Sequence, residues 1–167
     1  MQGLLARTKT GAATLSYRRR FEELGVAWPS LERPALPFSP TVRVADIVYV
    51  SGQIPEIGPE IAAIGQVGAE IDLAAAQNAA RLCAANIVYW LDRELDGNLD
   101  RVVKFAKLTV YVNAAAGFSA YSEVGNGASE FLLHVFGGRG EHARCSLGMA
   151  GLPANVPVEA DAIVHVR

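Results

Sequence analysis

The sequence predicts an α+β domain in which helices pack on one face of a mixed β-sheet. Two segments, 72–96 and 118–136, carry apolar residues at the spacing of helices that bury one side. Four others, at 44–51, 103–112, 145–150 and 158–166, are rich in β-branched and aromatic residues, as strands are. A fifth, short strand is expected at 66–70. After a short N-terminal helix the order is β-β-α-β-α-β-β. No further helix is available for the second face of the sheet, so we expect another copy of the chain to cover it.

The composition favours a protein that associates with other subunits and does not favour a membrane-spanning or nucleic-acid-binding protein. Hydrophobic residues make up 51% of the 167 residues and charged residues only 19%, which favours burial of some surface against another subunit. The net charge of −2 does not favour a nucleic-acid partner. No apolar run reaches the ~18 residues that span a bilayer, and no signal peptide is visible. The two cysteines form no disulfide pattern, so a cytoplasmic location is expected.

The first forty residues are predicted to hold one helix. Residues 1–14 have the composition of a loose leader. Leu15–Leu24 is predicted to be a helix that Gly25 ends. Trp28–Pro40 contains four prolines and is expected to be an extended connector.

Two strands and a long helix follow in the prediction. Val44–Ser51 is expected to be a strand, residues 55–65 a loop, and Gln66–Glu70 a short strand that returns in a hairpin. Asp72 is placed to cap a helix that ends near Asp96. Cys83 lies on the apolar side of this helix and is predicted to be a small buried side chain.

The second half of the chain is expected to alternate strand and helix. Val103–Val112 reads as a strand. The helical pattern of 118–136 is interrupted by Gly125-Asn126-Gly127, so the helix is expected to begin around Asn126, which would cap it. Gly137–Gly140 is predicted to be a flexible link.

Residues 142–164 carry the most conspicuous charges. They read as a hairpin of two strands, Cys145–Ala150 and Val158–Val166, joined by a turn. Arg144 and Glu159 lie among apolar residues, so neither is placed to solvate a surface. Arg144 can grip a carboxylate with two donors, while Glu159 can position a water. Alternatively, the two side chains pair with each other across the hairpin, since buried charges need partners.

Other candidate groups carry weaker signals. Cys145 follows Arg144, but successive strand residues face opposite ways, so its thiol is expected to point away from that cation. The three histidines have no metal-ligand spacing, and no metal site is predicted. Gly52, between Ser51 and Gln53, could offer a backbone N–H to an anion. No nucleotide-binding glycine motif follows a strand, so no cofactor is expected.

Several motifs together resemble the RidA/YjgF family, whose members are small trimers with a chorismate-mutase-like (bacillus type) fold. The similarity runs from about Phe38 to Arg167, which divides the chain into an N-terminal part (1–37) and a RidA/YjgF-like domain (38–167). It is greatest for the longer branch that carries an endoribonuclease label. The matching stretches are Tyr49–Pro55, Gly65–Gly68, Ala79–Leu82, Asp100–Val103, Leu108–Val112, Asn126–Ser129, His142–Arg144, Leu152-Pro153, Val158-Glu159 and Ala162-Ile163.

The resemblance implies a homotrimer with clefts between subunits that bind a small carboxylate. In deaminase members an arginine grips the substrate carboxylate and a glutamate holds the attacking water; Arg144 and Glu159 take these positions. Gly52 would give a backbone N–H and Asn126 a side-chain amide. The reaction is the hydrolysis of 2-aminoacrylate-type enamines or imines to a 2-keto acid and ammonia, without a cofactor.

Two positions depart from the deaminase pattern. Phe38 stands where those members have a tyrosine, and Ser146 stands where they have a cysteine, with Cys145 one residue earlier. Three functions are therefore carried forward: an enamine/imine hydrolase or a hydrolase of a related carboxylate, a non-catalytic protein that binds a small carboxylate, and a ribonuclease. The last rests on the family label alone.

Overall fold

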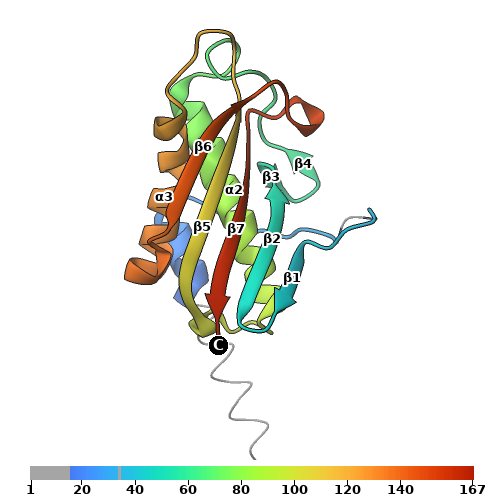
Figure 1. The fold of residues 1–167 in the computed structure, drawn as a ribbon, viewed down its shortest axis with the longest axis vertical. Helices are drawn as coiled ribbons and strands as arrows, with labels where there is room; N and C mark the ends of the chain where they lie inside the picture. The colour runs from blue at the N-terminus through green and yellow to red at the C-terminus, as the bar shows by residue number, and fades with distance from the viewer. Residues whose placement is uncertain (1–15, 34) are drawn as a thin grey trace, which may run out of the picture.

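The computed structural model describes residues 16–33 and 35–167, and the predicted leader at 1–14 and Leu15 lie outside this part. Five strands form one mixed sheet in the order β1-β2-β7-β5-β6, and α2 and α3 lie behind it (Figure 1). The predicted α+β fold, with two helices on one face of a mixed sheet, is confirmed. The elements are β1 (Thr41–Val44), β2 (Ile47–Gln53), β3 (Glu56–Ile57), β4 (Glu60–Ile61), α2 (Leu73–Glu94), β5 (Val102–Asn113), α3 (Tyr121–Phe136), β6 (Ala143–Met149) and β7 (Val158–Val166), with short 3-10 turns at Leu99–Arg101, Gly137–Gly140 and Pro153–Asn155.

The expected hairpin between residues 145 and 166 is wrong. β6 pairs with β5 in parallel, whereas β7 pairs with β5 and β2 in antiparallel fashion. β5 therefore lies between the two strands that follow one another in sequence. The reason is the α3 crossover, which brings the chain back alongside β5 in the same direction and leaves β7 to fill the other side of β5.

The first predicted strand is two strands. Val44 ends β1, and β2 begins at Ile47 and runs past Ser51 to Gln53. The tight turn between them places Ala45 at φ 53°, a conformation that alanine seldom adopts, so its sequence gave no turn signal.

A second small hairpin lies where a loop was expected. β3 and β4 pair across Gly58-Pro59. The predicted strand Gln66–Glu70 does not form, because Val67 makes only isolated bridges, to Ile71 and Ala114.

The long helix is built as its sequence predicts. The Asp72 carboxylate accepts a hydrogen bond from the backbone N–H of Ala75 at 2.8 Å, which satisfies one of the free donors of the first turn. Cys83 is fully buried on the apolar side, and burial raises the pKa of its thiol well above the ordinary value. The helix ends at Glu94, two residues before the expected end.

The helix α3 begins at Tyr121, five residues before the predicted start at Asn126. Gly125 and Gly127 do not interrupt it, because both occupy positions where another group lies against the helix. A Cβ at Gly127 would lie 2.0 Å from the backbone oxygen of Gln77 on α2. The expected link at Gly137–Gly140 forms a 3-10 turn, and Gly140 is buried against the α3 backbone.

The N-terminal helix, residues 16–23, packs on the helical layer and not on the sheet. Tyr17 and Phe21 are buried, and the Phe21 ring meets that of Phe131 on α3 edge to face, 4.7 Å between centroids. The described part of the proline-rich connector has no helix or strand, as predicted.

Among the described residues, no helix covers the other face of the sheet. Side chains alternate along β7 between a buried set facing the helices and a partly exposed set. Large apolar side chains on this second face and its edge are exposed, among them Tyr49, Leu147 and Met149. We refer to this surface as the open face.

Replacing Gly127 by alanine should destabilise the fold by about 2 kcal/mol, because the added methyl group overlaps a backbone oxygen and forces α2 and α3 apart. Urea unfolding followed by circular dichroism would measure the change. Gly138→Ala is the matched control, since a Cβ there meets nothing within 4 Å. Equal stability of both variants would contradict the tight contact.

Candidate functional site

Arg144 lies on β6 and reaches toward α3. Its Nη1 group donates to Asn126 Oδ1 at 3.1 Å and to Ser129 Oγ at 2.8 Å, and Nη2 donates to the backbone oxygen of Ser122 at 3.0 Å. All three acceptors belong to α3, so one helix fixes the guanidinium. The predicted candidates Arg144 and Asn126 are thus in direct contact.

Two donors of Arg144 remain available. A guanidinium has five N–H groups, and the three bonds above leave Nε–H and one Nη2–H without an acceptor among the described residues. Ser146, two residues along β6 and on the same side of it, has a buried hydroxyl that makes no hydrogen bond to any described residue. Gly125 lets the α3 backbone pack closely against this hydroxyl and the guanidinium, since a Cβ there would lie 2.5 Å from Ser146 Oγ and 3.1 Å from Arg144 Cζ. The two unused guanidinium donors and the unpartnered hydroxyl lie close together, and this combination of charge and donors is suited to an anion.

Glu159 lies on the opposite face of the sheet. It belongs to the partly exposed set of β7, next to Gly52 at the bulged end of β2, where a Cβ would lie 1.9 Å from Glu159 Oε1. Glycine is therefore required at position 52 for this carboxylate to lie as it does. Burial raises the pKa of the Glu159 carboxyl above its ordinary value, and the nearby Asp161 raises it further.

Two residues that the sequence did not single out complete this part of the open face. Asp161 follows Glu159 by two positions, so both carboxylates point the same way. The Tyr111 hydroxyl donates to Asp161 Oδ2 at 2.6 Å. This hydrogen bond, together with burial, raises the pKa of Tyr111 to about 12. The sequence pattern Glu159-x-Asp161 within a predicted strand could have indicated that these two carboxylates share one face of the sheet.

Arg144 and Glu159 do not pair. No ion pair joins them among the described residues, so the alternative of an internal salt bridge is wrong. Leu108 of β5 pairs with Arg144 of β6 and with Ala162 of β7, and these three side chains face the helices. Glu159 lies three residues before Ala162 on β7, so its side chain points to the opposite face. Within one chain the two candidates lie on different faces of the sheet.

The remaining candidates divide between the two faces. Cys145 is exposed on the open face and points away from Arg144, as expected, and Lys107 Nζ lies 3.4 Å from its sulfur. Phe38 is 50% exposed in the connector. The Ser39 carbonyl beside it accepts a hydrogen bond from the Ser51 hydroxyl at 2.7 Å, which brings this part of the connector close to Gly52.

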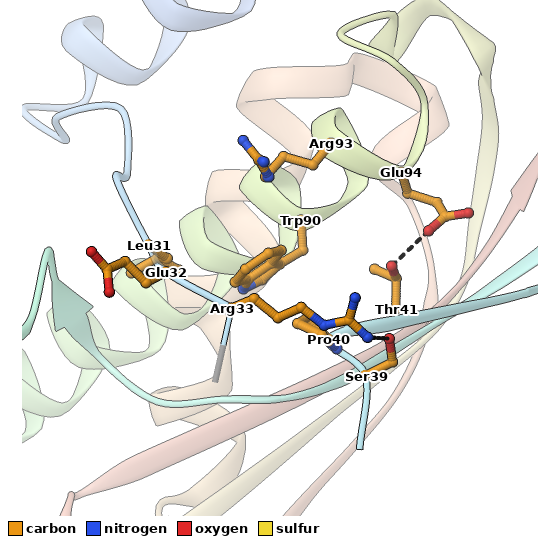
Figure 2. Close-up of a pocket in the computed structure, with 9 residues that line it drawn as sticks. All are labelled: Leu31, Glu32, Arg33, Ser39, Pro40, Thr41, Trp90, Arg93 and Glu94. Carbon is orange, nitrogen blue, oxygen red and sulfur yellow. Dashed lines mark hydrogen bonds between the residues drawn. The ribbon is translucent and has the colours of Figure 1, made fainter. Parts of the chain in front are cut away.

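A cavity of about 500 Å³ lies elsewhere, between the connector, β1 and the end of α2 (Figure 2). Trp90, Arg93 and Glu94 line it from the helix. Glu94 accepts a hydrogen bond from Thr41 at 2.7 Å, and Arg33 donates to Ser39 at 3.1 Å. Neither Arg144 nor Glu159 lines this cavity, which borders the strand at the far edge of the sheet from β6.

Residues 16–33 and 35–167 contain no group of three histidine, cysteine or acidic side chains close enough to bind a metal ion. Among the same residues, no helix has the length and apolar character needed to cross a membrane.

Comparisons with known proteins agree on one family. The family model described as Endoribonuclease L-PSP matches residues 30–166. Protein TCP17 of Trypanosoma cruzi is 40% identical over 147 residues, 87% of this chain and 91% of that protein. The crystal structure of Atu1372 from Agrobacterium tumefaciens, a protein with unknown function, matches with a TM-score of 0.90 at 36% identity, covering 97% of this chain and 99% of that one. The YjgF gene product of E. coli matches in fold, with a TM-score of 0.58 at 24% identity, covering 84% and 98%.

Glu159→Gln should raise the free energy of unfolding at neutral pH. Because the pKa of Glu159 is raised in the folded state, the fold binds this proton more tightly than the unfolded chain does, and the stability from this group is lost as pH rises through the folded pKa. A neutral glutamine avoids that loss.

Urea unfolding at neutral pH and near pH 4 would show the gain of Glu159→Gln shrinking as the pH falls. The exposed Glu130→Gln serves as control. A loss of stability at both pH values would contradict the prediction.

Proposed function

The chain belongs to the endoribonuclease L-PSP family, the family of RidA and YjgF, and from this membership we propose that it hydrolyses small enamines or imines of the 2-aminoacrylate type to a 2-keto acid and ammonia. The observation that carries the proposal is the pair of unused Arg144 donors beside the unpartnered hydroxyl of Ser146. A carboxylate accepts two parallel N–H bonds from a guanidinium. The Ser146 hydroxyl would add a third bond.

Glu159 is proposed to move the proton. The imine tautomer of the substrate has an electrophilic carbon, to which water adds. The Glu159 carboxylate takes the proton of that water as the C–O bond forms and the C=N electron pair moves to nitrogen. Glu159 then returns the proton to nitrogen, the carbinolamine loses ammonia, and the 2-keto acid remains. A carboxyl whose pKa is raised by burial suits both directions of transfer. The backbone N–H of Gly52 would orient the substrate.

The two groups are proposed to meet at an interface between subunits. Arg144 and Glu159 lie on different faces of one sheet, so a small substrate cannot contact both in one chain. Proteins of this family are typically oligomeric. The exposed apolar side chains of the open face, such as Tyr49 and Leu147, favour covering by a neighbour. We propose a homotrimer in which the Arg144 edge of one subunit meets the open face of the next.

A second candidate function is binding of a small carboxylate without turnover. Phe38 favours it, because phenylalanine at 50% exposure has no hydroxyl with which to assist proton transfer. Calorimetry with 2-keto acids would show binding, while 2-aminoacrylate would release ammonia no faster than in buffer.

Arg144→Ala should lower kcat/KM for ammonia release from 2-aminoacrylate generated in situ by about 100-fold, since a lost charged hydrogen-bonding partner costs about 3 kcal/mol. Arg144→Lys should recover part of this, because it keeps the charge without the planar fork. Arg33→Ala, at the separate cavity, is the matched control. Wild-type release at the buffer rate would exclude the deaminase, and RNA cleavage that persists in Arg144→Ala and Glu159→Ala would point to a contaminant.

Mixed oligomers should test the shared site. Arg144→Ala and Glu159→Ala, each strongly impaired alone, are expected to regain about a quarter of wild-type activity when subunits are mixed at random, because one site in four then receives an intact Arg144 and an intact Glu159 from neighbouring chains. Co-expression with two affinity tags, followed by the ammonia assay, would measure this. No recovery in a verified mixed trimer would contradict the interface site.

A further inference from the structure

A series of hydrogen bonds runs from the Gly140 carbonyl through His142 and Ser129 to Arg144. Binding of an anion by Arg144 does not by itself require this series. We infer that Ser129 and His142 are positioning residues, which hold the guanidinium for anion binding only while the His142 ring is neutral. This inference rests on the proposed function of Arg144. It adds that protonation of His142, which does not contact the anion, controls anion binding by Arg144.

The direction of each bond in the chain follows from chemistry. The Gly140 carbonyl can only accept, so His142 Nδ1, 2.6 Å away, carries a hydrogen. In a neutral ring Nε2 is then an acceptor, and the Ser129 hydroxyl, 2.9 Å away, donates to it. The Ser129 oxygen in turn accepts from Arg144 Nη1 at 2.8 Å. Every donor in this chain has one acceptor.

The fold ties these groups to one helix. Ser129 and Asn126 are three residues apart on α3 and therefore lie on the same side of the helix, and both accept from Arg144 Nη1. Gly140 is buried against the α3 backbone, so the carbonyl that orients His142 is tied to the same helix. Helix, ring and guanidinium form one unit.

Protonation would disrupt this unit. A cationic ring donates from both nitrogens, so the Ser129 hydroxyl would lose the acceptor for its own hydrogen and would have to accept from two cations. The charged groups acting on the ring are Arg144 on β6 and Lys104 on β5, and Lys104 is itself paired with Glu141 at 3.0 Å. Burial, followed by these two cations, lowers the pKa of His142, against the opposing effect of the Gly140 carbonyl. The neutral His142 ring is favoured at neutral pH, and the hydrogen bonds that link it to Ser129 and Arg144 are weakened at acidic pH.

Nitrogen NMR of the full chain tests the inference without a ligand. The unmodified protein should show His142 as the Nδ1–H tautomer, and the Arg144 side-chain signals should shift along the His142 titration. Ser129→Ala should abolish that coupling and Ser129→Thr, which keeps the hydroxyl, should retain it. His134→Gln, at an exposed histidine paired with Glu23, should change neither. An Nε2–H tautomer in the unmodified protein, or coupling that survives in Ser129→Ala, would overturn the inference.

Pyruvate binding separates this inference from the proposed function. Calorimetry should show binding to the wild type that weakens several-fold between about pH 7 and pH 5, while His142→Gln, which keeps an acceptor for Ser129 and cannot be protonated, should bind almost independently of pH. Equal pH dependence in both proteins would overturn the role of His142. Absence of binding even at neutral pH would count against the carboxylate site of Arg144, and the tautomer and coupling measurements would still decide the hydrogen-bond chain.

Discussion

Pairing of β5 with two strands that run in opposite directions is the constraint on which the site depends. β6 lies parallel to β5 on one side and β7 antiparallel on the other, so the register of both is set by the same backbone. Since side chains alternate along each strand, this register assigns Arg144 to the helical face and Glu159 to the open face. A chain with the predicted hairpin would have allowed the two charges to meet and neutralise each other. The observed order keeps them apart and leaves each with unused capacity for a ligand.

The helical layer determines the shape of the arginine half. Gly127 lets α3 approach the backbone of α2, and Gly125, half a turn away on the same helix, lets α3 approach Ser146 and Arg144. Two glycines that weaken an isolated helix therefore allow close packing against α2 on one side and against Ser146 and Arg144 on the other. The N-terminal helix packs against α3 through Phe21, which supports this helix from behind. Packing and binding thus depend on the same helix.

Much of the fold could be predicted, because the periodic segments are long. The spacing of apolar residues identified α2 and α3, and the Asp72 cap was placed correctly. The errors fall where local chemistry gives a poor signal. Ala45 occupies a turn that favours glycine or asparagine, and Gly125 and Gly127 look like helix breakers until the neighbouring chain segments are known. The candidates Arg144, Glu159, Gly52 and Asn126 were identified by pattern and resemblance, whereas Ser129 and Asp161 emerged only from contacts.

The sequence by itself determined the composition of each element: which segments are helix or strand, which residues carry charge among apolar neighbours, and to which family the pattern is similar. These properties are local, because the spacing of apolar residues, the capping residues and the side-chain types are all found within one short segment of the sequence. Only the tertiary structure decided which strand lies between β6 and β7, which face each charge occupies, and which hydrogen bonds hold Arg144. Those relations join residues such as Gly52 and Glu159, more than a hundred positions apart, and they are fixed by strand register and helix packing, which no single segment encodes.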